Sequence, residues 1–152
     1  MNRRSLLFTS TAAVVTFCAV IRAAAWELIS KDQADAVNSK PTEREALPSQ
    51  DSRAPVIKVE SPNIDNPVKT PVSIRLRFTP QPGATIDPKS FQAKYGWFDI
   101  TKQIVANAKV DATGLTADNA QIPPGRYRVT LQVADTSGHV GKKVIEFTVV
   151  AS

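Results

Sequence analysis

The chain has few of the residues on which metal and thiol chemistry depend. Its 152 residues include one Cys, one His and one Met, and the Met is the initiator. A single Cys excludes an internal disulfide, and a lone His without a second Cys leaves a zinc or copper cluster short of ligands. The chain has only 6 Gly, and no glycine-rich loop is present to hold a phosphate group. We therefore expect neither a metal site nor a cofactor.

Groups suited to catalysis are also scarce. A nucleophile needs an activating base within hydrogen-bond reach, and His139 lies in an expected hairpin beside Gly138. The remaining candidates for acid–base chemistry are four aspartates, Asp87, Asp99, Asp111 and Asp135. Most of them have a local role as turn or cap residues, and for Asp135 an ordinary turn is favoured over a calcium ligand. The sequence predicts that the protein is not an enzyme.

No apolar run is long enough for a stable membrane span. The longest uncharged stretch, Ser5 to Ile21, is shorter than the roughly 20 residues of a spanning helix and includes several Ser and Thr. It follows Arg3 and Arg4 and is followed by Arg22 and three alanines at 23–25. A positive start, an apolar stretch and a small-residue site together predict a signal peptide at 1–25, cleaved after Ala25. An uncleaved anchor is the second interpretation.

Two export routes stay open for this segment. Residues 2–7, Asn-Arg-Arg-Ser-Leu-Leu, resemble a twin-arginine signal, whose pathway carries folded proteins. Two arginines are equally ordinary in any positive start. In either case Cys18 leaves with the signal, and the expected location is periplasmic or secreted.

The charge is distributed unevenly along the chain. The formal net charge of +5 is composed of +3 in residues 1–25, −2 in 26–53 and +4 in 54–152. After removal of the signal the protein is nearly balanced, so nucleic acid is not an expected partner. Residues 31–53 contain two prolines, many charges and few apolar side chains. They predict a flexible linker over 26–53, with one short helical piece before Pro41.

From Ala54 onward apolar and polar residues alternate, which is typical of half-buried strands. Strands are expected over Pro55–Glu60, Val72–Thr79, Phe91–Trp97, Val110–Leu115, Asn119–Ile122, Arg126–Val133 and Lys142–Val150. Asp99 precedes apolar residues at helical spacing, which predicts a short helix over Ile100–Asn107 between central strands. About seven strands with one wet face each predict an all-β fold, an antiparallel β-sandwich over 54–152.

Two stretches carry a family resemblance. Residues 122–138 read IPPGRYRVTLQVADTSG and residues 78–91 read FTPQPGATIDPKSF. Both are similar to bacterial Ig-like and fibronectin-type-III-like domains, in which a Pro-Gly turn leads into a strand with an early Tyr. The resemblance implies structural roles for Gly125, Tyr127, Asp135 and Gly138, with Tyr127 as a tyrosine corner bonded to nearby backbone.

Six residues are candidates for a binding surface: Trp97, Phe98, Arg75, Arg77, Arg126 and Arg128. In an extended strand one of the two adjacent aromatics must point outward as a platform for a sugar ring or apolar partner, unless both fold under the following helix. The arginine pairs could grip a polyanion, but an Ig-like fold would place them on opposite sheets.

These features together predict an exported, noncatalytic interaction or structural module of the cell envelope. Its expected partner is an unknown envelope protein or a glycan, and it would contact a membrane only through the N-terminal segment, if that segment stayed uncleaved. The alternative is a domain that binds carbohydrate or an envelope polyanion.

Overall fold

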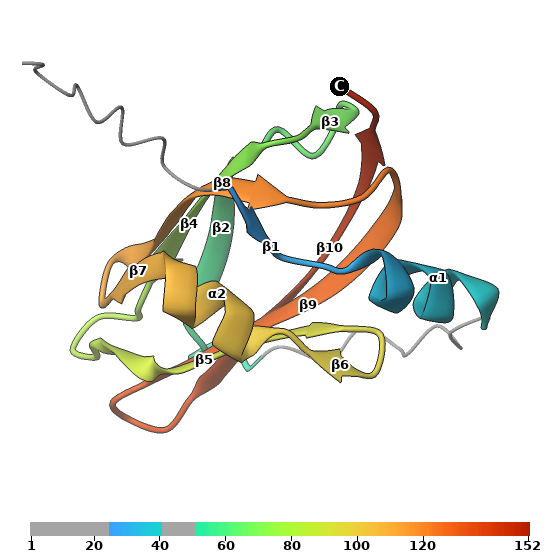
Figure 1. Ribbon diagram of the computed structural model, residues 1–152. Coiled ribbons are helices and arrows are strands. Elements are labelled where there is room, and N and C mark those ends of the chain that lie inside the picture. Colours follow the sequence, from blue (N-terminus) through green and yellow to red (C-terminus); the bar gives the residue numbers. More distant parts are fainter. Residues whose placement is uncertain (1–24, 41–50) are drawn as a thin grey trace, which may run out of the picture.

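The protein folds into two β-sheets that pack as a sandwich-like structure, seen here in a computed structural model that describes residues 25–40 and 51–152 (Figure 1). The expected all-β fold is confirmed. The predicted signal peptide lies outside the described residues except for Ala25, and so does part of the predicted linker, residues 41–50. In the described parts of the chain there are ten strands and two helices.

Three of these strands have only two residues, and the other seven agree with the expected number. The strands are β1 (Trp26–Glu27), β2 (Val56–Ser61), β3 (Val68–Lys69), β4 (Val72–Thr79), β5 (Ile86–Tyr95), β6 (Phe98–Asp99), β7 (Ala108–Asp111), β8 (Gly114–Gln121), β9 (Gly125–Asp135) and β10 (Val140–Val150). The helices are α1 (Lys31–Ser39) and α2 (Thr101–Asn107).

The first sheet has the order β1-β8-β4-β2, with β7 also paired to β8, and the second has the order β3-β10-β9-β5-β6. The sheets are mixed, which corrects the prediction of a purely antiparallel sandwich. Strand β1 runs parallel to β8, and β3 runs parallel to β10. Each parallel partner is distant in sequence, so the long connection that a parallel pair requires is present. Two-residue strands have no periodicity, and the alternation pattern could not reveal them.

Alternating sequence correctly predicted which side chains point into the core. In β4 the side chains of Val72, Leu76 and Phe78 are buried, while Arg75 and Arg77 are exposed. Strand β9 repeats the arrangement, because its buried side chains are those of every second residue from Tyr127 to Asp135. The two sheets bury these apolar faces against each other, as expected for a sandwich.

The expected strand Val110–Leu115 is wrong, because a tight hairpin interrupts it. Strand β7 ends at Asp111, whose carboxylate accepts hydrogen bonds from the backbone N–H groups of Thr113 (2.8 Å) and Gly114 (3.1 Å). Strand β8 then begins at Gly114 and continues through Asn119, where a second strand was expected to start. Asn119 has a φ of 58°, at a position where the pairing with β4 shifts register. It forms a bulge within one strand.

The predicted helix between central strands is present as α2. The expected cap at Asp99 is wrong, because the N-cap residue is Ile100 and no side chain caps the helix, which begins at Thr101. The Asp99 carboxylate instead accepts a hydrogen bond of 2.9 Å from the Thr101 backbone N–H just before the helix. Ile100 and Ile104 are buried, while Val105 is 48% exposed. The helix therefore covers the edge of the core with one apolar face.

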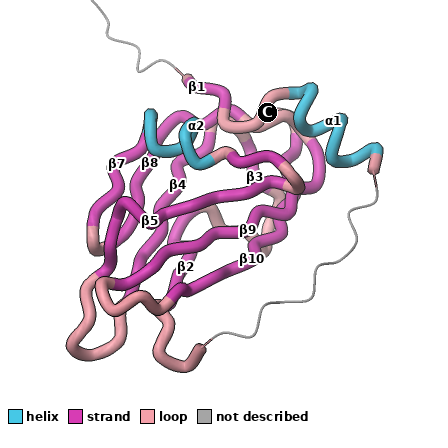
Figure 2. The backbone as a smooth tube through the Cα atoms, turned by 90° about the horizontal axis from the view of Figure 1, so that it is seen from below, coloured by secondary structure: helices cyan, strands magenta, loops and turns pink. Residues whose placement is uncertain are grey.

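Residues 26–40 are not a linker, which corrects the prediction for that part of the chain. Leu28 and Ile29 are buried in the core at 5% and 0% exposure. Ser30 then caps α1 through a capping box: its hydroxyl accepts from the Gln33 backbone N–H (3.2 Å), and the Gln33 side chain accepts from the Ser30 N–H (3.1 Å). Figure 2 shows β1, α1 and α2 along one side of the sandwich. Burial of the Leu28 and Ile29 side chains therefore orders a segment whose polar composition predicted a flexible linker.

Candidate functional site

A tight hairpin between β5 and β6 holds the two candidate aromatic residues. Tyr95 pairs with Phe98 across the hairpin, so Gly96 and Trp97 form a two-residue turn. Gly96 has a φ of 57°, which a residue without a side chain adopts at little cost. The expected strand therefore ends at Tyr95, and Trp97 lies in the turn instead of a strand.

The two aromatics have different environments. Trp97 is 52% exposed, whereas Phe98 is partly buried and packs against the core. Their ring centroids are 5.4 Å apart. Trp97 thus does not fold under the following helix, and its indole is presented to solvent at the tip of a short hairpin that is anchored by Phe98.

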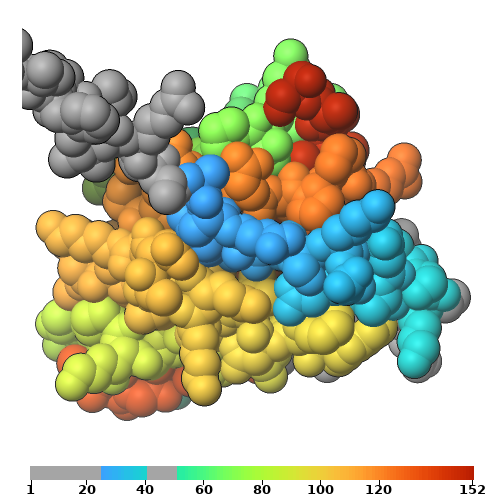
Figure 3. Space-filling view, viewed as in Figure 1, coloured from blue at the N-terminus to red at the C-terminus, as the bar shows by residue number. Residues whose placement is uncertain are grey.

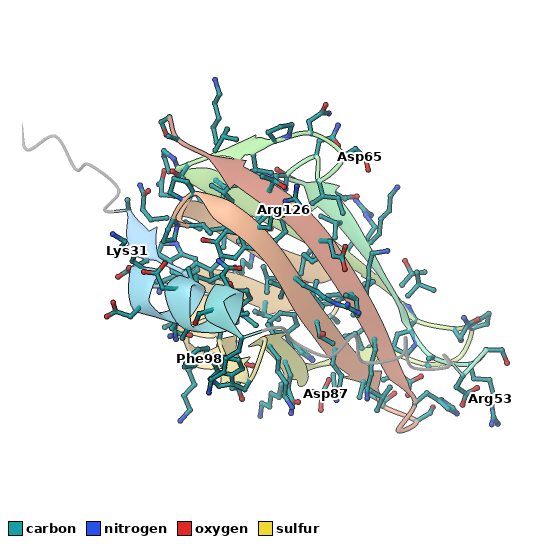
Figure 4. All side chains as sticks on the ribbon, turned by 90° about the vertical axis from the view of Figure 1, so that its right-hand side faces the viewer. Lys31, Arg53, Asp65, Asp87, Phe98 and Arg126 are labelled. Carbon is teal, nitrogen blue, oxygen red and sulfur yellow. The ribbon has the colours of Figure 1, made fainter. Side chains whose placement is uncertain are left out.

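The C-terminal end of α1 packs against the turn that holds Trp97. The ammonium group of Lys40 lies 5.6 Å from the centroid of the Trp97 ring, within the range of a cation–π contact. A Cβ added to Gly96 would lie 2.9 Å from a methyl carbon of Val37, so helix and turn are in close contact. Figure 4 shows Phe98 beside α1. The sequence predicted a short helical piece before Pro41, and α1 is that helix. It did not predict that Val37 and Lys40 contact the turn, because this part of the chain was interpreted as a linker. The Ser-x-x-Gln capping-box pattern at 30–33 is the signal that marks the start of the helix.

The four candidate arginines lie on opposite sheets. Arg75 and Arg77 belong to β4 in the first sheet, and Arg126 and Arg128 belong to β9 in the second. The arrangement provides no single basic patch from all four side chains.

Three of these arginines have acidic neighbours. Arg77 binds the Glu60 carboxylate at 2.7 Å, and this hydrogen bond lowers the pKa of Glu60 below its usual value. Arg75 lies 3.9 Å from Asp118, and Arg128 lies 3.6 Å from Glu146. Pairing of this kind at exposed positions contributes little to stability, but it reduces the local positive potential.

Arg126 borders a surface groove of about 490 Å³ on the second sheet. The groove is bounded by the loop after β2, including Asp65, and by the ends of β9 and β10, as Figure 4 illustrates for Arg126 and Asp65. Arg128 and Glu146 also line it. Both signs of charge are present in the groove, so its composition does not select an anion.

The hydroxyl of Tyr127 makes the backbone hydrogen bond that the family resemblance implies. It donates to the carbonyl oxygen of Pro123 at 2.6 Å, and Gly125, the first residue of β9, lies between the two in the sequence. Burial raises the pKa of Tyr127 to about 12, so the phenol remains a hydrogen-bond donor at neutral pH. This bond ties the start of β9 to the preceding turn.

Asp135 and Gly138 close the turn between β9 and β10. The Asp135 carboxylate accepts hydrogen bonds from the backbone N–H groups of Ser137 and His139, both at 2.9 Å, and lies 3.2 Å from Nδ1 of His139. The Gly138 N–H donates to the Asp135 carbonyl at 3.1 Å. The hydrogen bonds that join Asp135 to Ser137 and His139 therefore stabilise the turn between β9 and β10.

Replacing Asp135 with asparagine is expected to lower stability at neutral pH, and the deficit should shrink in acid. Burial raises the pKa of Asp135, but hydrogen bonds from His139 and Ser137 outweigh burial and lower it below the usual value. A depressed carboxyl pKa stabilises the fold above the unfolded pKa of about 4 and loses that contribution as pH falls through the folded value. Urea unfolding at several pH values measures the difference. The exposed Asp65→Asn variant serves as control, and an Asp135→Asn deficit that is constant with pH would contradict the expectation.

The other three candidate carboxylates also accept hydrogen bonds from backbone N–H groups two residues further along the chain. Asp87 accepts from the backbone N–H of Lys89 at 3.0 Å, and hydrogen bonds from Thr101 and Thr113 lower the pKa values of Asp99 and Asp111 respectively.

Across residues 25–40 and 51–152, no three His, Cys, Asp or Glu side chains lie where they could hold a metal ion. Within those same residues, neither helix has the length and apolar character needed to cross a membrane.

Comparison of the chain with protein-family models, with curated proteins and with solved structures gave no match.

Proposed function

We propose that the chain is an exported, noncatalytic Ig-like interaction module of the cell envelope. The strand order supports the Ig-like assignment. If the seven longer strands are lettered A to G in chain order, one sheet has the spatial order β2-β4-β8-β7 and the other has the order β10-β9-β5. These correspond to the A-B-E-D and G-F-C orders of a seven-stranded immunoglobulin sandwich.

The observation that carries an interaction role is the exposed indole of Trp97. It is 52% exposed on a two-residue turn whose neighbours are fixed by strand pairing and by the end of α1. A large aromatic side chain on a rigid support loses little conformational entropy on binding, which favours it as an anchor in an interface.

Replacing Trp97 with alanine is expected to weaken binding of the mature domain to its envelope partner by about 10-fold or more, since an aromatic anchor contributes most of its energy through burial. Affinity capture from envelope extracts, followed by titration with the captured component, measures the effect. Val105→Ala is the matched control, because Val105 is also exposed and apolar, at 48%. Equal binding by both variants would remove Trp97 from the interface.

Location requires a separate test. Cell fractionation should find the protein outside the cytosol, with an N-terminus that begins at Trp26. Full-length protein in the cytosol with an intact N-terminus would end the export proposal.

Carbohydrate is the second candidate ligand, and the same residue favours it. A half-exposed indole offers a flat apolar surface on which the face of a sugar ring stacks. The polyanion form of this alternative has less support, because three of the four arginines have carboxylate neighbours. Binding on a glycan array that is lost in Trp97→Ala and kept in Val105→Ala would support a neutral-glycan ligand.

A further inference from the structure

The expected cleavage site lies at the first residue of a docked strand. Trp26, which would become the first residue after cleavage, pairs with Ala120 of β8. Its indole N–H donates to the Asp118 carbonyl at 2.8 Å, and the Leu28 N–H donates to the Gln121 carbonyl at 2.9 Å. Backbone pairing therefore begins immediately after the expected scissile bond.

The residues that follow hold this strand in place. Leu28 and Ile29 are buried in the core, and Ala34 of α1 is buried at 3% exposure. In Figure 3 the segment from β1 through α1 lies across the molecule, between residues of β8 and β9 on one side and of β5, β6 and α2 on the other. Releasing the segment from β1 through Ile29 would expose the side chains of Leu28 and Ile29 to water, which makes this open form rare.

A peptidase binds its substrate as an extended chain and contacts residues on both sides of the bond it cleaves. While this segment is paired with β8, the backbone groups of Trp26 and Leu28 cannot form hydrogen bonds with a peptidase. Cleavage of a folded domain would depend on the small population in which β1 has detached.

We propose that removal of residues 1–25 precedes the docking of β1, so that the chain meets the peptidase unfolded and leaves the cytoplasm by the general secretory route. A twin-arginine substrate would arrive folded, with the bond after Ala25 protected. This inference rests on the proposed export of the protein and selects between the two routes that the N-terminal sequence leaves open.

Cleavage of the full-length precursor by purified signal peptidase in detergent tests the order of events. We expect the folded precursor to be cleaved about 100-fold or more slowly than a precursor with a short flexible Gly-Ser spacer inserted between Ala25 and Trp26. The spacer moves the scissile bond away from β8 without altering the domain. Equal rates would overturn the inference while leaving the export proposal intact. Failure of both precursors and of the urea-unfolded chain to be cleaved would overturn the export proposal, and this inference with it.

The route is tested in bacterial cells with the double variant Arg3→Lys, Arg4→Lys. It keeps the positive start but removes the twin-arginine signature. Pulse-chase labelling should show processing at the unmodified rate. Loss of processing in this variant, with processing of the unmodified chain intact, would assign the protein to the twin-arginine route and overturn the inference.

Discussion

Replacing Ile29 with alanine is expected to lower the free energy of unfolding by about 2–5 kcal/mol, the range for truncation of a fully buried Ile or Leu. Ile29 has 0% exposure and lines an apolar cavity of about 50 Å³ between the sheets. Truncation would enlarge that cavity, so the substitution loses both packing contacts and apolar burial. Urea unfolding of the mature chain, followed by far-UV circular dichroism, measures the change.

The result decides between two descriptions of residues 26–40. A flexible linker would tolerate the substitution, whereas a segment that completes the core would not. Glu27→Ala is the control, because Glu27 is exposed on β1, two residues from Ile29. It should change stability by no more than about 0.5 kcal/mol, as is usual for surface positions. Indistinguishable midpoints for Ile29→Ala and Glu27→Ala would contradict the docked arrangement of this segment.

Sequence alone predicted the parts of the fold in which long strands alternate. In β4 and β9 the period of two extends over many residues, and burial of one face fixes which side chains point inward. The two-residue strands were not predicted, because two residues cannot show a period. The pair Leu28–Ile29 is too short to have a period, and only the tertiary structure shows that both side chains fill the core.

The candidate site was predicted in part. Trp97 and Phe98 were identified from their adjacency, but their exposure depends on the turn at Gly96, which converts the end of an expected strand into a hairpin tip. Lys40 and Val37 were not predicted, since their contribution depends on the docking of α1. Local sequence therefore identified the aromatic residues. The residues of α1 that surround them could not be identified, because they reach the turn only through contacts between distant segments of the chain.

Replacing Gly114 with alanine is expected to destabilise the fold by at least about 3 kcal/mol, at or above the upper end of ordinary overpacking. A Cβ at this position would approach the Leu76 carbonyl oxygen and carbon to 2.0 Å and 3.1 Å, so the backbones of β4 and β8 would have to separate. Gly114 pairs with Arg77 in that ladder, and the adjacent Phe78 N–H donates to the Thr113 carbonyl at 2.9 Å. Separation would disturb these bonds and displace the buried side chains of Leu76 and Leu115. Thermal and urea unfolding measure the loss.

The control for Gly114→Ala is Gly83→Ala, which separates close approach from backbone conformation. Gly83 has a φ of 82°, but a Cβ there would meet no atom within 4 Å. Alanine at position 83 should therefore cost only about 1–2 kcal/mol, the penalty of a left-handed conformation, partly offset by the reduced freedom of the unfolded chain. If the two variants lost equal stability, the cost at Gly114 would not arise from contact between β4 and β8. A larger loss at Gly114 would show that the absence of a side chain there sets the spacing of the two strands at the centre of the first sheet.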